Sequence, residues 1–198
     1  MTHSTKTQTI EWSTGSWTHP PAAERTDGTT LIVSAIEGSD AWRHTSYGFV
    51  HDSEHALVAP LKPGSAIEVS FIASFDQQFD QAGAFLRIDE TKWIKAGVEF
   101  ADGQLQLGAV VTNGKSDWSV APVPEWSGRK VTVRASLASE SVTIRARVDD
   151  EPFRLVRVAP FGPDEDIKAG PFCCAPTRSG LEVQFLSWIV TDADGSLH

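Results

Sequence analysis

The stretch DQAGAFLRIDETKWIKAGVEFADGQLQLGAVVTNGKSDW, residues 80–118, decides the fold, because its apolar and polar residues alternate as they do in antiparallel β-strands. Turn residues at positions 89–92 and at positions 102–103 divide the stretch into three expected strands. The Asp-Gly turn at 102–103 places Glu99 opposite Gln106 in the next strand. The stretch therefore predicts a β-meander around which the rest of the chain is organised.

The two faces of this meander differ in chemistry, since successive strand side chains point to opposite sides of a sheet. The same register sets Trp93 opposite Thr112. The back face is apolar and comprises Ala84, Leu86, Ile88, Ile94, Val98, Phe100, Leu105, Leu107 and Val111. The front face carries Gly83, Phe85, Arg87, Trp93, Lys95, Gly97 and Glu99.

Further short strands are expected on both sides of the meander, because β-branched or alternating segments recur between turn residues. They cover residues 29–36, 42–51, 66–75, 130–137, 141–148, 153–159, 167–175 and 181–191. An apolar period of 3.6 residues persists nowhere for three turns. The sequence thus predicts an all-β protein, a two-sheet antiparallel sandwich of jelly-roll type. We expect one domain over residues 1–198, with residues 1–8 frayed.

Composition excludes several classes of function. The net charge of −9, from 26 acidic and 17 basic residues, argues against a nucleic-acid partner, which needs a basic surface. No window approaches 18 apolar residues, so we expect no membrane partner. The first twelve residues lack the apolar core of a secretory signal, and the two cysteines, Cys173 and Cys174, are adjacent and expected to be packed thiols. These features favour a reduced, cytoplasmic protein.

Several motifs along the chain resemble the family called domain of unknown function 1349, also called regulation of enolase protein 1-like, of the concanavalin A-like lectin/glucanase superfamily. They are Asp40-Ala41-Trp42, Tyr47-Gly48-Phe49 with Asp52, FDQAG at 79–83, LRID at 86–89, WIKAGVE at 93–99, VVT at 110–112, SDWS at 116–119 and GPF at 170–172 with Ala175-Pro176. The resemblance implies a concanavalin A-like sandwich with a concave face and implies no particular activity. Phe79 stands where the family pattern has Tyr, which removes a phenol that could act as a general acid.

The front face is the first candidate site. Its polar residues suggest a sugar platform on which an indole stacks and charged groups bind hydroxyls; the alternative is a solvated face with cross-strand ion pairs. Arg87 and Lys95 are expected to face each other, which calls for an anion between them. The residues are Arg87, Trp93, Lys95, Glu99 and Thr112, with Asp117 and Trp118 in the following loop.

A second candidate group precedes the meander. Asp40, Trp42, His44 and Tyr47 include two side chains on one strand face, Trp42 and His44, and the resemblance places this strand beside the same groove. The alternative is a core Trp42 and a surface His44. The resemblance adds Asp80 and Gln81 to the ligand-binding residues.

Metal and covalent chemistry find little support in the sequence. His51, Asp52, Glu54 and His55 are metal ligands by type, but their spacing matches no metal motif, and a polar hairpin loop is the preferred interpretation. We expect no metal and no cofactor. The sequence has no GxSxG motif and no cysteine placed with a histidine, so it gives no sign of a catalytic nucleophile.

The sequence favours a cytoplasmic module that binds a carbohydrate or sugar acid on the concave face, with Trp93 and Trp42 stacking and Arg87 and Lys95 holding an anionic end. Glu99 and Asp117 would orient hydroxyls. We expect binding rather than catalysis. One alternative is a glycoside hydrolase or lyase with Glu99 as the acid or base. Another, which rests on the family's name, is a protein-interaction domain that regulates a metabolic enzyme.

Overall fold

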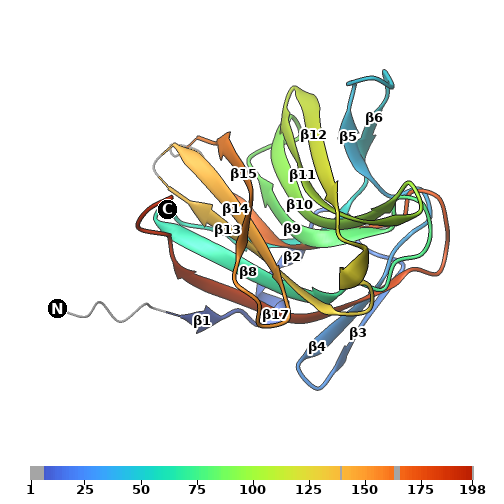
Figure 1. Ribbon diagram of the computed structural model, residues 1–198, viewed down its shortest axis with the longest axis horizontal. Coiled ribbons are helices and arrows are strands. Elements are labelled where there is room, and N and C mark those ends of the chain that lie inside the picture. The colour runs from blue at the N-terminus through green and yellow to red at the C-terminus, as the bar shows by residue number, and fades with distance from the viewer. Residues whose placement is uncertain (1–6, 139, 163–165, 198) are drawn as a thin grey trace.

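The computed structural model describes residues 7–138, 140–162 and 166–197, and within these ranges it consists almost entirely of β-strands in two packed antiparallel sheets (Figure 1). This confirms the predicted all-β, concanavalin A-like sandwich. Two short 3₁₀ helices, η1 (Trp12–Thr14) and η2 (Pro124–Trp126), interrupt the strands. Among the described residues, neither helix has the length and hydrophobicity that a membrane crossing requires.

The first sheet contains the two hairpin strands that the sequence predicts at 130–137 and 141–148. In spatial order its strands are β15 (Arg154–Pro160), β14 (Ser141–Val148), β13 (Lys130–Leu137), β8 (Ser65–Ile72), β17 (Glu182–Asp192), β4 (Thr30–Ser34) and β3 (Ala23–Asp27), with β1 (Gln8–Thr9) paired to β17.

The second sheet contains the meander and presents the candidate site. Its strands are β12 (Lys115–Pro122), β11 (Gln104–Asn113), β10 (Lys92–Ala101), β9 (Gln81–Arg87), β16 (Lys168–Cys174), β7 (His55–Pro60) and β2 (Ser16–Trp17). A separate hairpin, β5 (Ala41–Arg43) and β6 (Val50–Asp52), stands beside the β10–β12 part of this sheet in Figure 1.

The meander has four strands rather than the three predicted. The pairs Glu99–Gln106 and Trp93–Thr112 occur as expected. The segment around Trp118, expected to be a loop, is the edge strand β12 paired to β11. Gly114 at φ 74° makes the tight Asn-Gly turn between them, which is a strong hairpin signal.

The hydrophobic core fills the space between the two sheets. The back face of the meander packs against the apolar faces of β8, β13, β14 and β17, and residues such as Leu86, Ile94, Val133 and Ile144 are fully buried. The predicted division of the meander into two faces is therefore confirmed. Cys173 and Cys174 are buried free thiols, as expected, and burial raises the pKa of Cys173 to about 12.

A candidate ligand-binding site on the front face

A pocket of about 350 Å³ opens on the front face of the second sheet, away from the core; we call it the front hollow. Its walls come from hairpin β5–β6 and β12, its floor from β9, β10 and β11, and one end from three loops. The lining residues are Gly38, Asp40, Trp42, Tyr47, Phe49, His51, Phe79, Gln81, Lys95, Glu99, Val110, Trp118 and Pro176.

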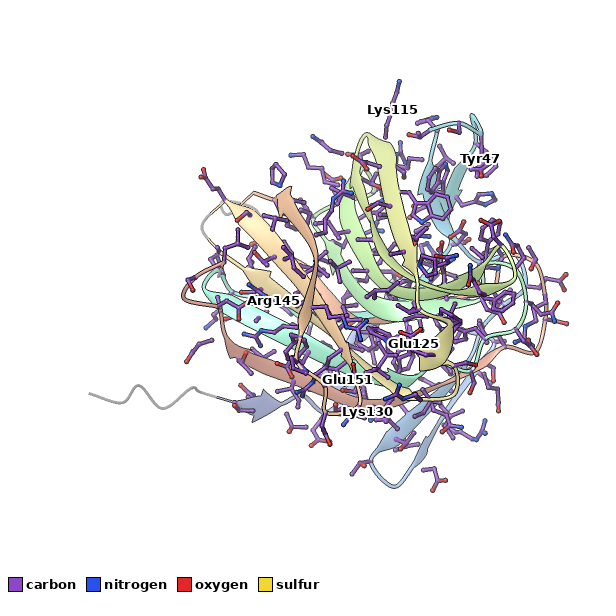
Figure 2. All side chains as sticks on the ribbon, viewed as in Figure 1. Tyr47, Lys115, Glu125, Lys130, Arg145 and Glu151 are labelled. Carbon is purple, nitrogen blue, oxygen red and sulfur yellow. The ribbon has the colours of Figure 1, made fainter. Side chains whose placement is uncertain are left out.

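The hairpin wall is aromatic. The Trp42 indole donates to the carbonyl of Thr45 at 3.0 Å, which fixes its ring inside the turn. The Tyr47 ring stacks on Phe49 at 5.2 Å, and Figure 2 shows Tyr47 near the tip of this hairpin. Trp118 stands on the opposite wall, with its ring perpendicular to that of Trp42 at 6.4 Å. Tyr47 is 59% exposed and Trp118 is 38% exposed, so both present ring surface to a ligand.

A row of glycines crosses the sheet beside the hollow. Gly83, Gly97 and Gly108 lie opposite one another across β9, β10 and β11. A Cβ at Gly97 would collide with the backbone oxygen of Ala82, so this position admits no side chain. The Lys95 and Glu99 side chains, which flank Gly97 on the same face of β10, therefore have no side chain between them on that strand.

Lys95 is a buried cation with its counter-ion already in place. Its Nζ donates to Asp40 Oδ1 at 2.8 Å, and the same oxygen accepts from the backbone N–H of Ala41 at 2.8 Å and from Gln81 Nε2 at 3.4 Å. Burial works against the charge, but the attractions of Asp40, Cys174 and Glu99 together outweigh it, and the pKa of Lys95 is raised. The Lys95–Asp40 pair is therefore ionised and internally neutral.

Glu99 has no such partner. Its Oε1 is buried and accepts no hydrogen bond within the described part of the chain. Burial, together with the negative charges of Asp40 and Asp102, raises the pKa of Glu99 to about 7. The positive charge of Lys95 and a hydrogen bond from the Trp118 side chain act in the opposite direction. A carboxyl group that titrates near neutral pH can exchange a proton with a ligand.

Trp93 does not line the front hollow, although it was predicted to stack on a sugar. It is 2% exposed and packs in a second apolar cluster, with its ring stacked on Phe85 at 5.6 Å. Ala41 and Trp42 of the hairpin belong to the same cluster and cover it. The hairpin thus closes one part of the front face, and Trp93 is a core residue.

Arg87 also lies outside the hollow, and the expected opposition of Arg87 and Lys95 is wrong. Arg87 pairs with Trp93, whereas Lys95 pairs with Phe85, because the Asp89 carboxylate accepts from the backbone N–H groups of Thr91 and Lys92 and tightens the turn. Arg87 Nη1 instead contacts Asp52 Oδ1 at 3.4 Å and Glu54 Oε1 at 3.5 Å.

These two carboxylates meet His19, which the sequence did not connect with them; ligand atoms of the three lie within 4.8 Å of one another. The guanidinium of Arg87 is the cation beside them in this structure. Of the other residues considered as metal ligands, His51 lines the hollow and His55 accepts from the backbone N–H of Ile36 at 3.0 Å.

The remaining predicted residues divide between structural positions and the hollow. Asp80 is fully buried and bound by Arg178, with Nη2 to Oδ2 at 2.7 Å. Asp117 points to the opposite side of β12 from Trp118 and pairs with Arg157 at 2.9 Å. Thr112 is buried against the Ser116 hydroxyl, and His44, at φ 61° in the hairpin turn, is not among the lining residues. The front hollow brings together six of the predicted residues: Trp42, Tyr47, Gln81, Lys95, Glu99 and Trp118.

Sequence reasoning missed Phe49 and left Asp40 and His51 out of the final set of ligand-binding residues. Tyr47, Phe49 and His51 follow one another at i, i+2 and i+4, a spacing that in a strand places side chains on one face. That alternation was the available signal. In the structure Tyr47 itself lies in the hairpin turn, before Gly48 at φ 77°. Asp40 was a candidate from the sequence, but its partner Lys95, which lies 55 residues away, could be recognised only from the structure.

The arrangement suits recognition of a small polar ring better than two-carboxylate hydrolysis. Glycoside hydrolysis ordinarily uses an acid and a second carboxylate as base or nucleophile. Asp40, the other carboxylate that lines the hollow, is held by Lys95, Gln81 and the Ala41 N–H. Aromatic walls above a polar floor are the usual features of a small-molecule site.

The fold and the front hollow define a concanavalin A-like β-sandwich with a pocket on one sheet face. Xylan beta-1,4-xylosidase from Bacillus halodurans shares this fold, with a TM-score of 0.62 and 14% identity over 82% of this chain and 32% of that chain.

The chain belongs to the family described as "Protein of unknown function (DUF1349)", whose model matches residues 17–193. It is 36% identical to "Regulation of enolase protein 1" of Saccharomyces cerevisiae over 94% of this chain and 93% of that protein. A crystal structure titled as a functionally unknown protein from Saccharomyces cerevisiae superimposes with a TM-score of 0.88 at 35% identity, covering 94% of this chain and all of that one.

Proposed function

We propose that the protein is a carbohydrate-binding module whose binding site is the front hollow. The observation that carries the proposal is the placement of exposed Tyr47 and Trp118 rings on two walls above the polar floor of Lys95, Gln81 and Glu99. The apolar face of a sugar ring packs on an aromatic ring, while its hydroxyls need donors and acceptors on the other side.

The geometry favours a sugar without an acidic group. The sequence predicts a ligand with an anionic end, because it places Arg87 and Lys95 opposite each other. Arg87 is outside the hollow, and the charge of Lys95 is neutralised by Asp40 at 2.8 Å. Lys95 therefore supports the proposal as a hydrogen-bond donor to a hydroxyl rather than as an anion receptor.

A thermal-shift screen of the purified protein against neutral sugars, sugar acids and sugar phosphates tests the proposal. A ligand at 100 times its Kd stabilises the fold by about 2.7 kcal/mol. For a domain of this size the melting temperature rises by about 5 to 10 °C. Trp118→Ala should abolish the shift, whereas Leu155→Ala, which removes an exposed apolar side chain on β15 of the other sheet, should retain it. A shift that survives Trp118→Ala would place binding elsewhere.

A second candidate is regulation of a metabolic enzyme through protein contact. The relative named "Regulation of enolase protein 1" favours it, as do the solvent-exposed Tyr47, Phe49 and Val50 on the hairpin. Biolayer interferometry with purified enolase tests it. If the function is correct, the wild-type protein binds enolase, Tyr47→Ala and Phe49→Ala weaken this binding, and Leu155→Ala leaves it unchanged. Absence of binding at micromolar concentrations would contradict the function.

A further inference from the structure

The charges around the front hollow do not balance. Its acidic and basic lining residues are Asp40, His51, Lys95 and Glu99. Asp40 and Lys95 form an ion pair at 2.8 Å and cancel. His51 is on the hairpin wall, with its ring edge against Phe49 at 4.5 Å. Lys95 also attracts Glu99, but one cation does not offset two carboxylates, so an ionised Glu99 leaves the hollow with one excess negative charge.

The carboxylate of Glu99 is also short of a hydrogen-bond donor. Its Oε1 is buried with no partner among the described residues, although it belongs to a side chain that lines the pocket. A buried acceptor without a donor is costly, and a ligand that supplies the donor removes that cost. Oε1 is closed to solvent in this conformation, so a ligand's donor reaches it once the Glu99 side chain turns toward the pocket.

The walls favour a positive charge at that position. Trp42 and Trp118 stand perpendicular to each other at 6.4 Å, and Tyr47 makes a tilted contact with Trp42 at 5.7 Å. The faces of aromatic rings are negative and attract ammonium groups. A charged donor to a carboxylate also makes a hydrogen bond roughly twice as strong as a neutral one.

We propose that the ligand of the front hollow is an amino sugar, whose protonated amine binds Glu99 Oε1 while its ring lies against Trp118 and Trp42. This inference rests on the carbohydrate-binding function proposed above and specifies its ligand class. Lys95, which lines the same hollow, donates to a ring hydroxyl. A sugar acid is disfavoured because its carboxylate would meet Glu99 without an unpaired cation to offset the repulsion.

Isothermal titration calorimetry at pH 7.5 tests this with glucosamine, galactosamine and mannosamine, each compared with its parent hexose and its N-acetyl derivative. At least one amine should bind about tenfold or more tightly than both of its neutral counterparts. Choline, which has the charge without the sugar ring, should bind more weakly than that amine. Glu99→Gln should remove the preference, and Glu125→Gln should keep it, because Glu125 is exposed on η2 and lies away from Tyr47 in Figure 2.

The outcomes separate this inference from the function on which it rests. Equal affinities for an amine and its parent hexose, or a preference that persists in Glu99→Gln, would overturn the amino-sugar assignment and leave the carbohydrate-binding function standing. If choline binds as tightly as the tightest-binding amino sugar, the sugar ring contributes nothing to affinity, and the amino-sugar assignment is overturned. Absence of binding by every sugar, neutral or charged, would overturn both.

Discussion

The front face of the second sheet has two parts. Side chains alternate along the strands in the same way in both, but hairpin β5–β6 covers one part and leaves the other open as the front hollow. In the covered part, Phe85, Trp93 and Phe172 lie under the hairpin residues Ala41 and Trp42. In the front hollow, Lys95 and Glu99 of β10, the strand that also carries Trp93, face a pocket together with Trp118 of β12. Alternation along a strand determines the face on which a side chain lies, but a distant segment decides whether that side chain becomes core or site.

The largest expected difference in stability is between substitutions of Trp93 and of Trp118. Trp93→Ala should lower the free energy of unfolding by about 3 to 5 kcal/mol, because it leaves a large cavity under the hairpin. Trp118→Ala should lower it by less than about 1 kcal/mol, since Trp118 lies at the surface. Urea denaturation measures both; equal losses would mean that the hairpin does not cover Trp93 in solution.

The next comparison is between the carboxylates of Asp80, which precedes β9, and of Glu99 on β10. Asp80 holds Arg178 through contacts of 2.7 to 3.1 Å, so Asp80→Ala breaks a buried pair and should cost about 3 kcal/mol. Glu99→Gln at pH 8 should instead raise stability, because it removes an uncompensated charge. The comparison fails if both substitutions destabilise the fold to the same extent in urea.

The pH dependence of stability should report on Glu99. Its pKa is about 7 in the folded protein, above the usual 4.5, so the folded state holds the proton more tightly than the unfolded chain does. Its contribution is therefore favourable below pH 4.5 and is lost as the pH rises through about 7, by up to about 3 kcal/mol. The difference in unfolding free energy between wild type and Glu99→Gln, measured from pH 4 to 8, should change by this amount. A constant difference would contradict the account.

The smallest expected effect on stability is at the hairpin tip. Tyr47→Ala should change the unfolding free energy by about 0.5 kcal/mol or less, because the ring is mostly exposed. It should still weaken binding of a sugar several-fold through the loss of ring contact. Calorimetry with Leu155→Ala as the matched exposed control checks this. Unchanged affinity in Tyr47→Ala would remove the hairpin tip from the binding site.

Much of the fold could be predicted because its signals are local. The meander register followed from the Asp-Gly turn, and the hairpin of β13 and β14 followed from alternation at 130–148. The position of Arg87 could not be fixed, because it depends on how the Asp89 side chain closes its turn.

The candidate site was only partly predictable because its key contacts join distant segments. Asp80 meets Arg178 across 98 residues, and Asp40 meets Lys95 across 55. No spacing rule links such pairs. Lys95 and Glu99 could be placed on the front face from the sequence. The ion pair of Lys95, and the Glu99 Oε1 that accepts no hydrogen bond among the described residues, emerged only with the fold.

The most direct test of the central claim is a ¹H–¹⁵N NMR titration that follows the indole N–H signals of the seven tryptophans. When a sugar ligand is added, the signals of Trp42 and Trp118 should shift, whereas that of Trp188, which is buried in the core between the two sheets, should stay in place. A shift of Trp188 without movement of Trp42 and Trp118 would contradict the assignment of the front hollow as the ligand-binding site.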